Sequence, residues 1–383
     1  MSIKVLIIHR QYRIRGGEDS FLDEILKPAL KASAIDFECL TLPPLLSSMT
    51  DLVEVFGMIT GLEKFRPSFW RCMSKIVNEK FTHVILNNCI PTISLSLPKE
   101  IRKKNLKTLT WVHNFRLDCA NGLRFNGKEF CTLCLDKGSH WSIIQNCQRN
   151  FFQSLLYALV YRRSRVARTF IPFIDGFICN SDFTKIYVVG LLKKLNLEGQ
   201  ASVLPMPTGA IRDEIAITEG RLSQLTEKLP KPFYIFLGRL SFEKGADLFL
   251  NLAKKYPDRG FLMCGEGPML EELKKTSLEN FVMAGVVSAQ EKPWLFKNCE
   301  ALIIPSRLPE TSSLVIAESQ AYGTPIVYPR GGGAEETFKR LGRTGCSLDE
   351  FTGQKFSKSF GVTKGSSLND FGFALANILS ELK

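Results

Sequence analysis

The chain has 383 residues, of which 45% are hydrophobic and 23% are charged. This composition excludes a disordered, collagen-like or disulfide-dense small protein, and the length suits about two domains of 150 to 200 residues each. Of the net charge of +12, residues 1–200 carry +11 (28 Lys and Arg against 17 Asp and Glu) and residues 201–383 carry +1 (22 against 21), which predicts an anionic partner for the first half: lipid headgroups, a phosphorylated acceptor or nucleic acid.

The chain shows no targeting or membrane-spanning pattern. The best apolar run, Leu155–Val160, is far shorter than the roughly 20 residues that cross a bilayer. Met1–His9 lacks the order of a signal peptide, because its basic residues follow the apolar stretch. Eleven cysteines without a secretory signal indicate reduced thiols. We therefore expect a cytoplasmic protein.

Short apolar strands alternate with helical patterns along the whole chain, which predicts parallel, doubly wound α/β sheets. In the first half, the predicted strands are Lys4–Ile8, Thr82–Leu86, Thr108–Val112, Gly176–Cys179 and Ser202–Leu204, with a helix at Ser20–Leu30. In the second half, the predicted strands are Phe233–Leu237, Phe261–Cys264, Phe281–Ala284, Ala301–Ile304 and Pro325–Tyr328, with helices at Ala246–Lys255, Met269–Lys275, Ala289–Lys297 and Ser313–Tyr322.

The two series of strands predict two Rossmann-like domains. Pro205–Pro232 contains four prolines and no clear periodicity, so we interpret it as an interdomain link. The expected boundaries are 1–205 for the first domain, with a Cys-rich loop at 115–150, 206–231 for the linker and 232–383 for the second domain. Ligands of such sheets bind at the carboxyl ends of the strands, so we expect the functional residues directly after strands, facing a cleft between the domains.

The first candidate motif is Arg15-Gly16-Gly17-Glu18, which follows the first strand. Paired glycines let backbone amides approach a ligand closely, and the start of the next helix favours an anion. A plain strand-to-helix turn explains the same residues.

The second candidate is Gly238-Arg239 with Lys244, after the first strand of the second series. Two fixed cations on one loop suit a diphosphate. The alternative is a solvated basic pair beside Glu243.

The third candidate runs from Pro305 to Glu318. Thr311 to Ser313 form a helix start, whose amides near Ser312, Ser313 and Leu314 would bind an anion without a metal. Glu310 and Glu318 are separated by at most about 12 Å along a helix, which matches the reach from the sugar to the ribose of a nucleotide sugar. Carboxylates accept bonds from hydroxyl pairs. Glu318 could instead be exposed, but its apolar neighbours predict burial and therefore a partner.

Together these motifs resemble retaining glycosyltransferase family 4, which has the GT-B fold. The resemblance rests on Glu310-x7-Glu318 preceded by Pro-Ser and followed by Ala-Tyr-Gly-Thr-Pro, on the upstream Gly-Arg and Glu-Lys-Gly motifs, and on Gly265-Glu266-Gly267-Pro268 between them. It covers most of the second half, together with the Gly-Gly loop and His113 in the first half. This sequence departs from the family pattern at Ser319 and in the glycine-rich run Arg330–Gly333.

The resemblance implies a role for each matching residue. Arg239 and Lys244 would hold the donor diphosphate, Glu310 the hexose and Glu318 the ribose. Gly16, Gly17, Gly238, Glu266, Ser312, Ser313 and Leu314 would line the donor site. His113 would contact the donor sugar, although a hydrogen-bonded structural histidine is the alternative. The implied catalytic set is His113, Glu310, Arg239 and Lys244, with no cofactor required.

The resemblance implies transfer of a hexose from a UDP- or GDP-sugar to a glycan or lipid-linked acceptor, in the assembly of cell-envelope polysaccharide or lipopolysaccharide. Two alternatives stay open. One is a GT-B-like epimerase or phosphorylase, although nothing here indicates the cofactor lysine of a phosphorylase. The other is a basic nucleic-acid-binding protein, which lacks support because no interleaved aromatic and basic motif is present.

Two further features stand in the first half. One is a group of four cysteines within 29 residues: Cys119, Cys131, Cys134 and Cys147. Because Cys131-x2-Cys134 has metal-ligand spacing, the group predicts a structural zinc that closes the long loop. The alternative is four unrelated thiols.

Phe151–Arg168 combines an apolar helical stripe with four arginines. Such a stripe is typical of a core helix, but the arginines could contact anionic lipid, so we also expect peripheral membrane association.

Overall fold

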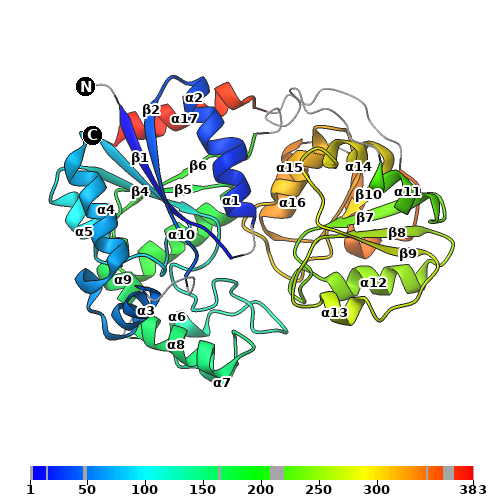
Figure 1. The fold of residues 1–383 in the computed structure, drawn as a ribbon, viewed down its shortest axis with the longest axis horizontal. Coiled ribbons are helices and arrows are strands. Elements are labelled where there is room, and N and C mark those ends of the chain that lie inside the picture. The colour runs from blue at the N-terminus through cyan, green and yellow to red at the C-terminus, as the bar shows by residue number, and fades with distance from the viewer. Residues whose placement is uncertain are drawn as a thin grey trace. The chain divides into compact units, whose positions relative to one another are not determined.

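The computed structural model describes residues 3–13, 16–45, 50–162, 165–207, 220–341, 344–356 and 366–382. The chain divides into unit 1, which contains Met1–Pro205 and Leu368–Lys383, and unit 2, which contains Met206–Ser367. Each unit is built on its own six-stranded parallel sheet with helices on both faces (Figure 1). The predicted architecture of two Rossmann-like domains is therefore confirmed.

Unit 1 has the strand order β2-β1-β3-β4-β5-β6. Its strands are β1 (Lys4–Arg10), β2 (Asp36–Leu42), β3 (His83–Asn87), β4 (Lys107–Val112), β5 (Gly176–Cys179) and β6 (Gln200–Val203). Its helices are α1 (Gly17–Phe21), a π-helical turn (Leu22–Leu26), α2 (Lys27–Ala32), α3 (Thr50–Thr60), α4 (Pro67–Asn78), α5 (Leu97–Arg102), α6 (Leu133–Asp136), α7 (Trp141–Ile144), α8 (Phe151–Tyr161), α9 (Arg165–Thr169), α10 (Asp182–Lys194) and α17 (Leu368–Glu381), with short 3-10 turns at Glu63–Phe65 and Ile171–Phe173.

Unit 2 has the strand order β12-β11-β10-β7-β8-β9. Its strands are β7 (Phe233–Leu237), β8 (Gly260–Cys264), β9 (Phe281–Gly285), β10 (Ala301–Ile303), β11 (Ile326–Tyr328) and β12 (Gly345–Ser347). Its helices are α11 (Arg221–Glu227), α12 (Ala246–Lys255), α13 (Leu270–Leu273), α14 (Lys292–Asn298), α15 (Leu314–Gln320) and α16 (Gly332–Leu341), with a 3-10 turn at Leu348–Glu350.

The central strands are apolar on both faces because helices cover both sides of the sheet. Leu6 and Ile8 of β1 pack in one core cluster with Phe69 of α4, whereas the alternate residues Val5 and Ile7 are fully buried on the opposite face. This two-sided burial is why the sequence reads as short, continuous apolar runs.

Two predicted boundaries are wrong in part. The segment 206–231 is not only a link, because α11 lies within it and Leu222 of that helix is fully buried in the core of unit 2; residues 208–219 lie outside the described part. The predicted second domain, 232–383, ends too late. Helix α17 belongs to unit 1, where it packs against α2 and where His83 Nε2 bonds to the Leu379 carbonyl at 2.9 Å.

Candidate functional site

In unit 2, the loop that follows β7 carries the two predicted cations, and each of them pairs with a carboxylate. Lys244 Nζ lies 3.0 Å from Oε1 of Glu310, whose side chain is 9% exposed. Arg239, which is 56% exposed, pairs with Glu243 at 2.6 Å. The structure thus brings together Lys244 and Glu310, which are far apart in sequence. Arg239 is held by its own loop instead.

A second contact fixes the β7 loop against the loop that follows β10. Arg307 forms a bidentate bond to Asp247 at 2.7 and 2.6 Å, and its guanidinium lies 3.8 Å from the centre of the Phe242 ring. The Arg307 amide also donates to the Glu243 carbonyl at 2.9 Å. Sequence reasoning missed Arg307, because a single arginine after a strand carries no local signal.

Glycine lets these loops approach each other. Gly245 has φ +73°, and a Cβ at this position would lie 1.9 Å from the Pro305 carbonyl oxygen. Gly333 packs directly against the loop that carries Glu310. Its amide donates to the Glu310 carbonyl at 2.6 Å, and a Cβ at position 333 would lie 2.2 Å from the backbone oxygen of Thr311. The glycine-rich departure from the family pattern therefore positions the loop that carries Glu310.

The start of α15 contains a buried hydroxyl without a partner. Ser312 Oγ is buried and has no hydrogen bond within the described part of the chain. Ser313 is the N-cap of α15, which begins at Leu314, and its side chain makes no capping bond. A buried hydroxyl normally has a partner, so Ser312 fits the predicted place for a ligand oxygen.

Glu318 is 4% exposed and pairs with Lys292 of α14 at 2.8 Å. The predicted need of this buried carboxylate for a partner is thus met by a residue that the sequence analysis did not name. Two other predicted donor residues make backbone bonds. Gly238, directly after β7, donates its amide to the Cys264 carbonyl. The backbone carbonyl of Glu266 accepts from the Leu240 amide at 2.8 Å, and Glu266 is exposed.

In unit 1, the Gly-Gly loop is held by Asp19. The Gly16 amide donates to Asp19 Oδ2 at 2.8 Å, and Gly17 is exposed with no atom within 4 Å of a Cβ built there. Arg15 of the predicted motif lies outside the described residues. No described residue of unit 1 comes close enough to require glycine at position 17. A role of Gly17 at the donor stays a prediction.

From Asp19, a chain of hydrogen bonds crosses the carboxyl ends of β1, β3, β4 and β5. Its five steps join Asp19 Oδ1 to His9 Nε2 (2.9 Å), His9 Nδ1 to Asn87 Nδ2 (2.9 Å), Asn87 Oδ1 to His113 Nε2 (2.7 Å), His113 Nδ1 to Asn180 Nδ2 (3.2 Å) and Asn180 Oδ1 to Trp111 Nε1 (2.7 Å). The two bonds of His113 fit a neutral ring with its proton on Nε2, because Asn87 Oδ1 accepts and Asn180 Nδ2 donates. His9 Nδ1 also lies 3.2 Å from the Asn87 carbonyl oxygen. The network links the Gly16 loop rigidly to His113.

His113 is neutral in this network. Burial and the neighbouring His9 lower its pKa to about 3. Both ring nitrogens are engaged by asparagines, and Phe21 packs on the ring edge at 4.9 Å between centroids. These contacts are those of the structural alternative, and contact of His113 with the donor sugar stays a prediction.

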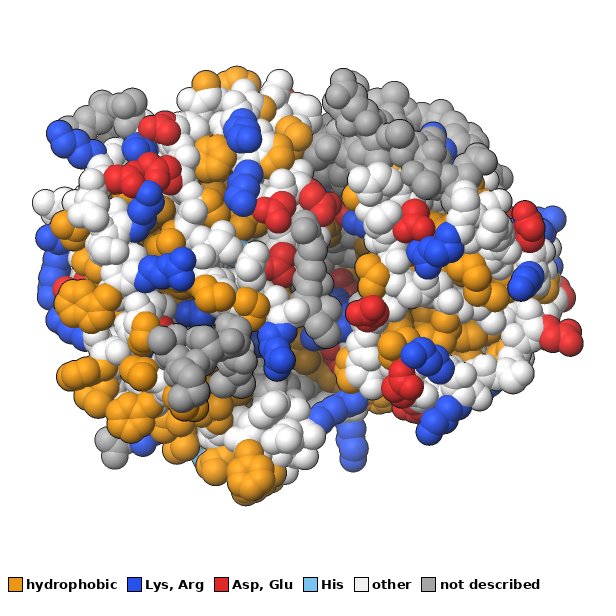
Figure 2. Space-filling view, in the orientation of Figure 1, with side chains coloured by type: hydrophobic (Ala, Val, Ile, Leu, Met, Phe, Trp, Pro, Cys, Tyr) orange, Lys and Arg blue, Asp and Glu red, His pale blue; other side chains and the backbone are white. Residues whose placement is uncertain are grey.

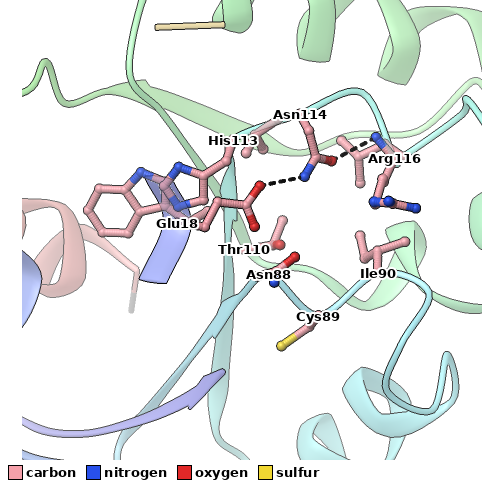
Figure 3. Close-up of a pocket in the computed structure, with 11 residues that line it drawn as sticks. Glu18, Asn88, Cys89, Ile90, Thr110, His113, Asn114 and Arg116 are labelled. Atoms are coloured by element: carbon pink, nitrogen blue, oxygen red, sulfur yellow. Dashed lines mark hydrogen bonds between the residues drawn. The ribbon is translucent and has the colours of Figure 1, made fainter. Parts of the chain in front are cut away.

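The network borders a shallow pocket of unit 1 that is open to solvent (Figure 3). It lies at the carboxyl ends of β3 and β4. Glu18, Asn114 and Arg116 line it, and sequence reasoning singled out neither Asn114 nor Arg116. Their signal was the position directly after the β4 strand, beside His113.

The four cysteines Cys119, Cys131, Cys134 and Cys147 line one small pocket of the long loop. Burial raises the pKa of the Cys147 thiol to about 11 and of the Cys119 thiol to about 12. Within the described ranges, however, no three His, Cys, Asp or Glu side chains are arranged to hold a metal ion. Zinc needs thiolates in close tetrahedral geometry, which these side chains do not form as they stand, and the structural zinc stays a prediction.

The predicted apolar and basic helix is two helices, α8 and α9, and part of its stripe faces solvent. Phe151 and Phe152 are 57% and 78% exposed, whereas Val160 is buried. Figure 2 shows hydrophobic side chains gathered on this side of unit 1. We define the apolar patch as the exposed side chains of Leu52, Val53, Phe56, Phe65, Trp70, Ile144, Phe151 and Phe152, which lie on α3, the turn Glu63–Phe65, α4, α7 and α8, a set of elements that contact one another. No described helix is long and apolar enough to cross a bilayer.

Comparisons with known proteins match these features. Residues 221–360 match the family model of Glycosyl transferases group 1. A 2-deoxystreptamine N-acetyl-D-glucosaminyltransferase of Niallia circulans is 32% identical over 30% of this chain and 31% of its own length, and a GDP-mannose-dependent phosphatidylinositol monomannoside mannosyltransferase of Mycolicibacterium smegmatis is 28% identical over 39% and 44%. The chain thus matches less than half the length of these relatives.

The fold also matches that of solved structures. The Anabaena protein HepE, solved with UDP-glucose, superposes with a TM-score of 0.56 at 17% identity and covers 99% of this chain and 89% of HepE. These matches confirm the predicted GT-B architecture and the resemblance to glycosyltransferases. Membership of family 4 and the retaining stereochemistry stay predictions.

Proposed function

We propose that this chain is a hexosyltransferase that uses a nucleotide-diphosphate sugar, linked to UDP or GDP, as the donor. The pairing of Lys244 with Glu310 is the observation that carries the proposal, because it joins a cation and a carboxylate at the carboxyl end of a parallel sheet within the segment matched to glycosyl transferases. The buried and unpartnered Ser312 hydroxyl beside Glu310 supports it.

In this proposal, the donor rearranges the ion pairs seen in the free chain. Lys244 and Arg239 exchange their carboxylates for the diphosphate, which carries more negative charge. Glu310 is then released to accept bonds from hexose hydroxyls, and Glu318, oriented by Lys292, accepts from the ribose. The backbone near Ser312 to Leu314, Gly238 and Glu266 complete the donor site of unit 2. A contact of the donor with His113, Gly16 and Gly17 of unit 1 stays a prediction from the resemblance.

The proposed reaction transfers the hexose with retention. The bond between C1 and the phosphate oxygen breaks, the acceptor oxygen forms the new bond to C1, and the acceptor proton leaves with the diphosphate. Lys244 and Arg239 stabilise the charge that develops on the departing diphosphate. No metal or organic cofactor enters this scheme.

The donor site can be tested with a panel of UDP- and GDP-sugars, by thermal shift and by release of free nucleotide. Lys244→Met and Glu310→Ala should each lower release about 100-fold or more and keep the far-UV circular dichroism of the wild type. Lys254→Met, at an exposed lysine of α12, is the matched control and should retain full activity. Full activity in both site variants would show that the assignment is wrong.

We further propose that the acceptor is a glycan or a lipid-linked sugar at an anionic membrane, in cell-envelope polysaccharide or lipopolysaccharide assembly. The aromatic residues of the apolar patch, with the exposed Arg71, Arg162 and Arg168 in the same unit, suit the interface of an anionic bilayer. Flotation with vesicles of phosphatidylglycerol should fall at least fivefold for the double variant Phe151→Ser and Phe152→Ser. Phe373→Ser, an exposed phenylalanine of α17, is the control. Flotation that is equal with neutral vesicles would refute the membrane proposal.

A further inference from the structure

The pocket beside His113 in unit 1 presents a carboxylate and a guanidinium to the same open space. Figure 3 shows Glu18, Asn114 and Arg116 along one side of it, with Asn88 and Thr110 on the sheet side. All the residues that line this pocket belong to unit 1. Their side chains therefore set which groups of a ligand the pocket can bind.

Glu18 is fixed in one orientation but keeps capacity for a ligand. Tyr12 donates its hydroxyl to Oε2 at 3.0 Å, and Asn114 donates its amide to Oε1 at 2.8 Å. Burial raises the pKa of Glu18, while the bonds from Asn114 and Tyr12 counteract this rise. Each carboxylate oxygen accepts more than one hydrogen bond, so the side chain can also receive ligand hydroxyls.

Arg116 keeps capacity for a ligand. Its Nη1 is buried without a hydrogen-bond partner among the described residues, although the Glu18 carboxylate of the same pocket attracts its charge. Its amide donates to Asn114 Oδ1 at 3.0 Å, its carbonyl accepts from the Tyr161 hydroxyl at 2.7 Å, and its guanidinium lies 5.6 Å from the centre of the Tyr157 ring. A buried guanidinium nitrogen without a partner is costly unless a ligand accepts its hydrogen bond.

The geometry points to an anionic sugar as the group bound here: Glu18 accepts its hydroxyls, and Arg116 binds its phosphate or carboxylate. This inference rests on the proposed function and assigns the acceptor to the pocket beside His113. A guanidinium suits both anions because its planar fork donates two parallel bonds to either. The two sources are a sugar phosphate, as in a lipid-linked acceptor, and a uronic acid in a growing glycan.

The test is isothermal titration calorimetry on the full chain with glucose 1-phosphate, glucuronate and the neutral methyl glucoside. We expect at least one anionic sugar to bind 10-fold or more tightly than the glucoside, and the better of the two identifies phosphate or carboxylate as the recognised group. Arg116→Gln should abolish this preference, and Glu18→Gln should weaken binding of all three sugars. Arg102→Gln, at an exposed arginine of α5 in unit 1, should leave the binding of all three sugars unchanged.

Two further variants keep the result interpretable. Lys244→Met should retain the preference for the anionic sugar, which excludes binding at the donor site of unit 2. Arg116→Lys keeps the charge but loses the fork, so it should retain part of the preference and shows whether Arg116→Gln fails only by misfolding. A glucoside that binds as tightly as both anions, or a preference that survives Arg116→Gln, overturns the inference. Nucleotide-sugar binding by the wild type and by Arg116→Gln is measured in parallel. If the wild type binds no nucleotide sugar, this result counts against the proposed function and not against the pocket.

Discussion

Loss of Lys292 should destabilise unit 2 by a measurable and predictable amount. Its ammonium lies 2.8 Å from Glu318, and the two side chains are 18% and 4% exposed. Lys292→Met keeps most of the aliphatic stem but leaves the buried Glu318 carboxylate without this cation. Removing one partner of a buried ion pair lowers the free energy of unfolding by about 3–5 kcal/mol. Because Lys292 is partly exposed, we expect the lower end of this range, about 3 kcal/mol. For a unit of this size, that is a decrease of about 6–12 °C in Tm.

The assay is unfolding of the full chain in urea and by heat, followed by circular dichroism and by tryptophan fluorescence. Trp294 reports on unit 2 directly, because it lies two positions after Lys292 and the other three tryptophans belong to unit 1. Lys254→Met is again the control. The double variant Lys292→Met with Glu318→Gln should recover most of the loss, because it leaves no buried charge unpaired. A cost below ~0.5 kcal/mol for Lys292→Met, or no recovery in the double variant, would refute the reasoning.

Three further predictions follow from the contacts described above. Gly245→Ala should lower the free energy of unfolding by about 2 kcal/mol or more and weaken nucleotide-sugar binding, because φ is positive and the Pro305 oxygen occupies the place of the Cβ; unchanged urea midpoints would contradict it. The pKa of His113 is lowered from 6.5 in the unfolded chain to about 3 in the folded chain. The free energy of unfolding is therefore highest above pH 6.5 and should fall by at most ~1.4 kcal/mol per pH unit below it, because only the unfolded chain then binds a proton at this histidine. His113→Gln should flatten this slope between pH 7 and 5, and an equal slope would show that other groups cause it. Arg307→Lys should cost about 1–2 kcal/mol, since lysine cannot reproduce the bidentate bond to Asp247, and equal stability of the two proteins would argue against that contact.

Much of the fold was predictable because the buried strands are continuous apolar runs. The predicted strands agree closely with the observed ones, and Phe233–Leu237 and Gly176–Cys179 agree residue for residue. Two of the four edge strands, β2 and β12, were missed for a physical reason. In Asp36–Leu42, charged residues alternate with apolar ones and most side chains are only half-buried, while β12 has three residues. Neither presents the uninterrupted apolar pattern of a strand covered on both faces.

The candidate site was predictable where it follows strands and not where it depends on pairing across the fold. Lys244 and Glu310 were each found from their position after a strand, but their contact at 3.0 Å joins positions 66 residues apart. Lys292 sits on a helix with no motif around it, so only the buried Glu318 indicated that some cation must be present. Likewise, the sequence named His113 but not Asn87 and Asn180, which hold it.

Helix α17 has a consequence for how the protein is made. Its Phe371 is almost fully buried and stacks on Trp111 at 6.0 Å between ring centroids, and Trp111 in turn stacks on His113. The sheet that holds His113 is complete at residue 205, but the helix that covers Trp111 is synthesised after all of unit 2. A nascent chain therefore exposes this aromatic surface while 162 residues of unit 2, Met206–Ser367, leave the ribosome. Helix α17 therefore completes unit 1 only after unit 2 has been synthesised. Translation that stops before α17 should yield a chain whose unit 2 can fold, while the uncovered aromatic surface of unit 1 promotes aggregation or binds chaperones.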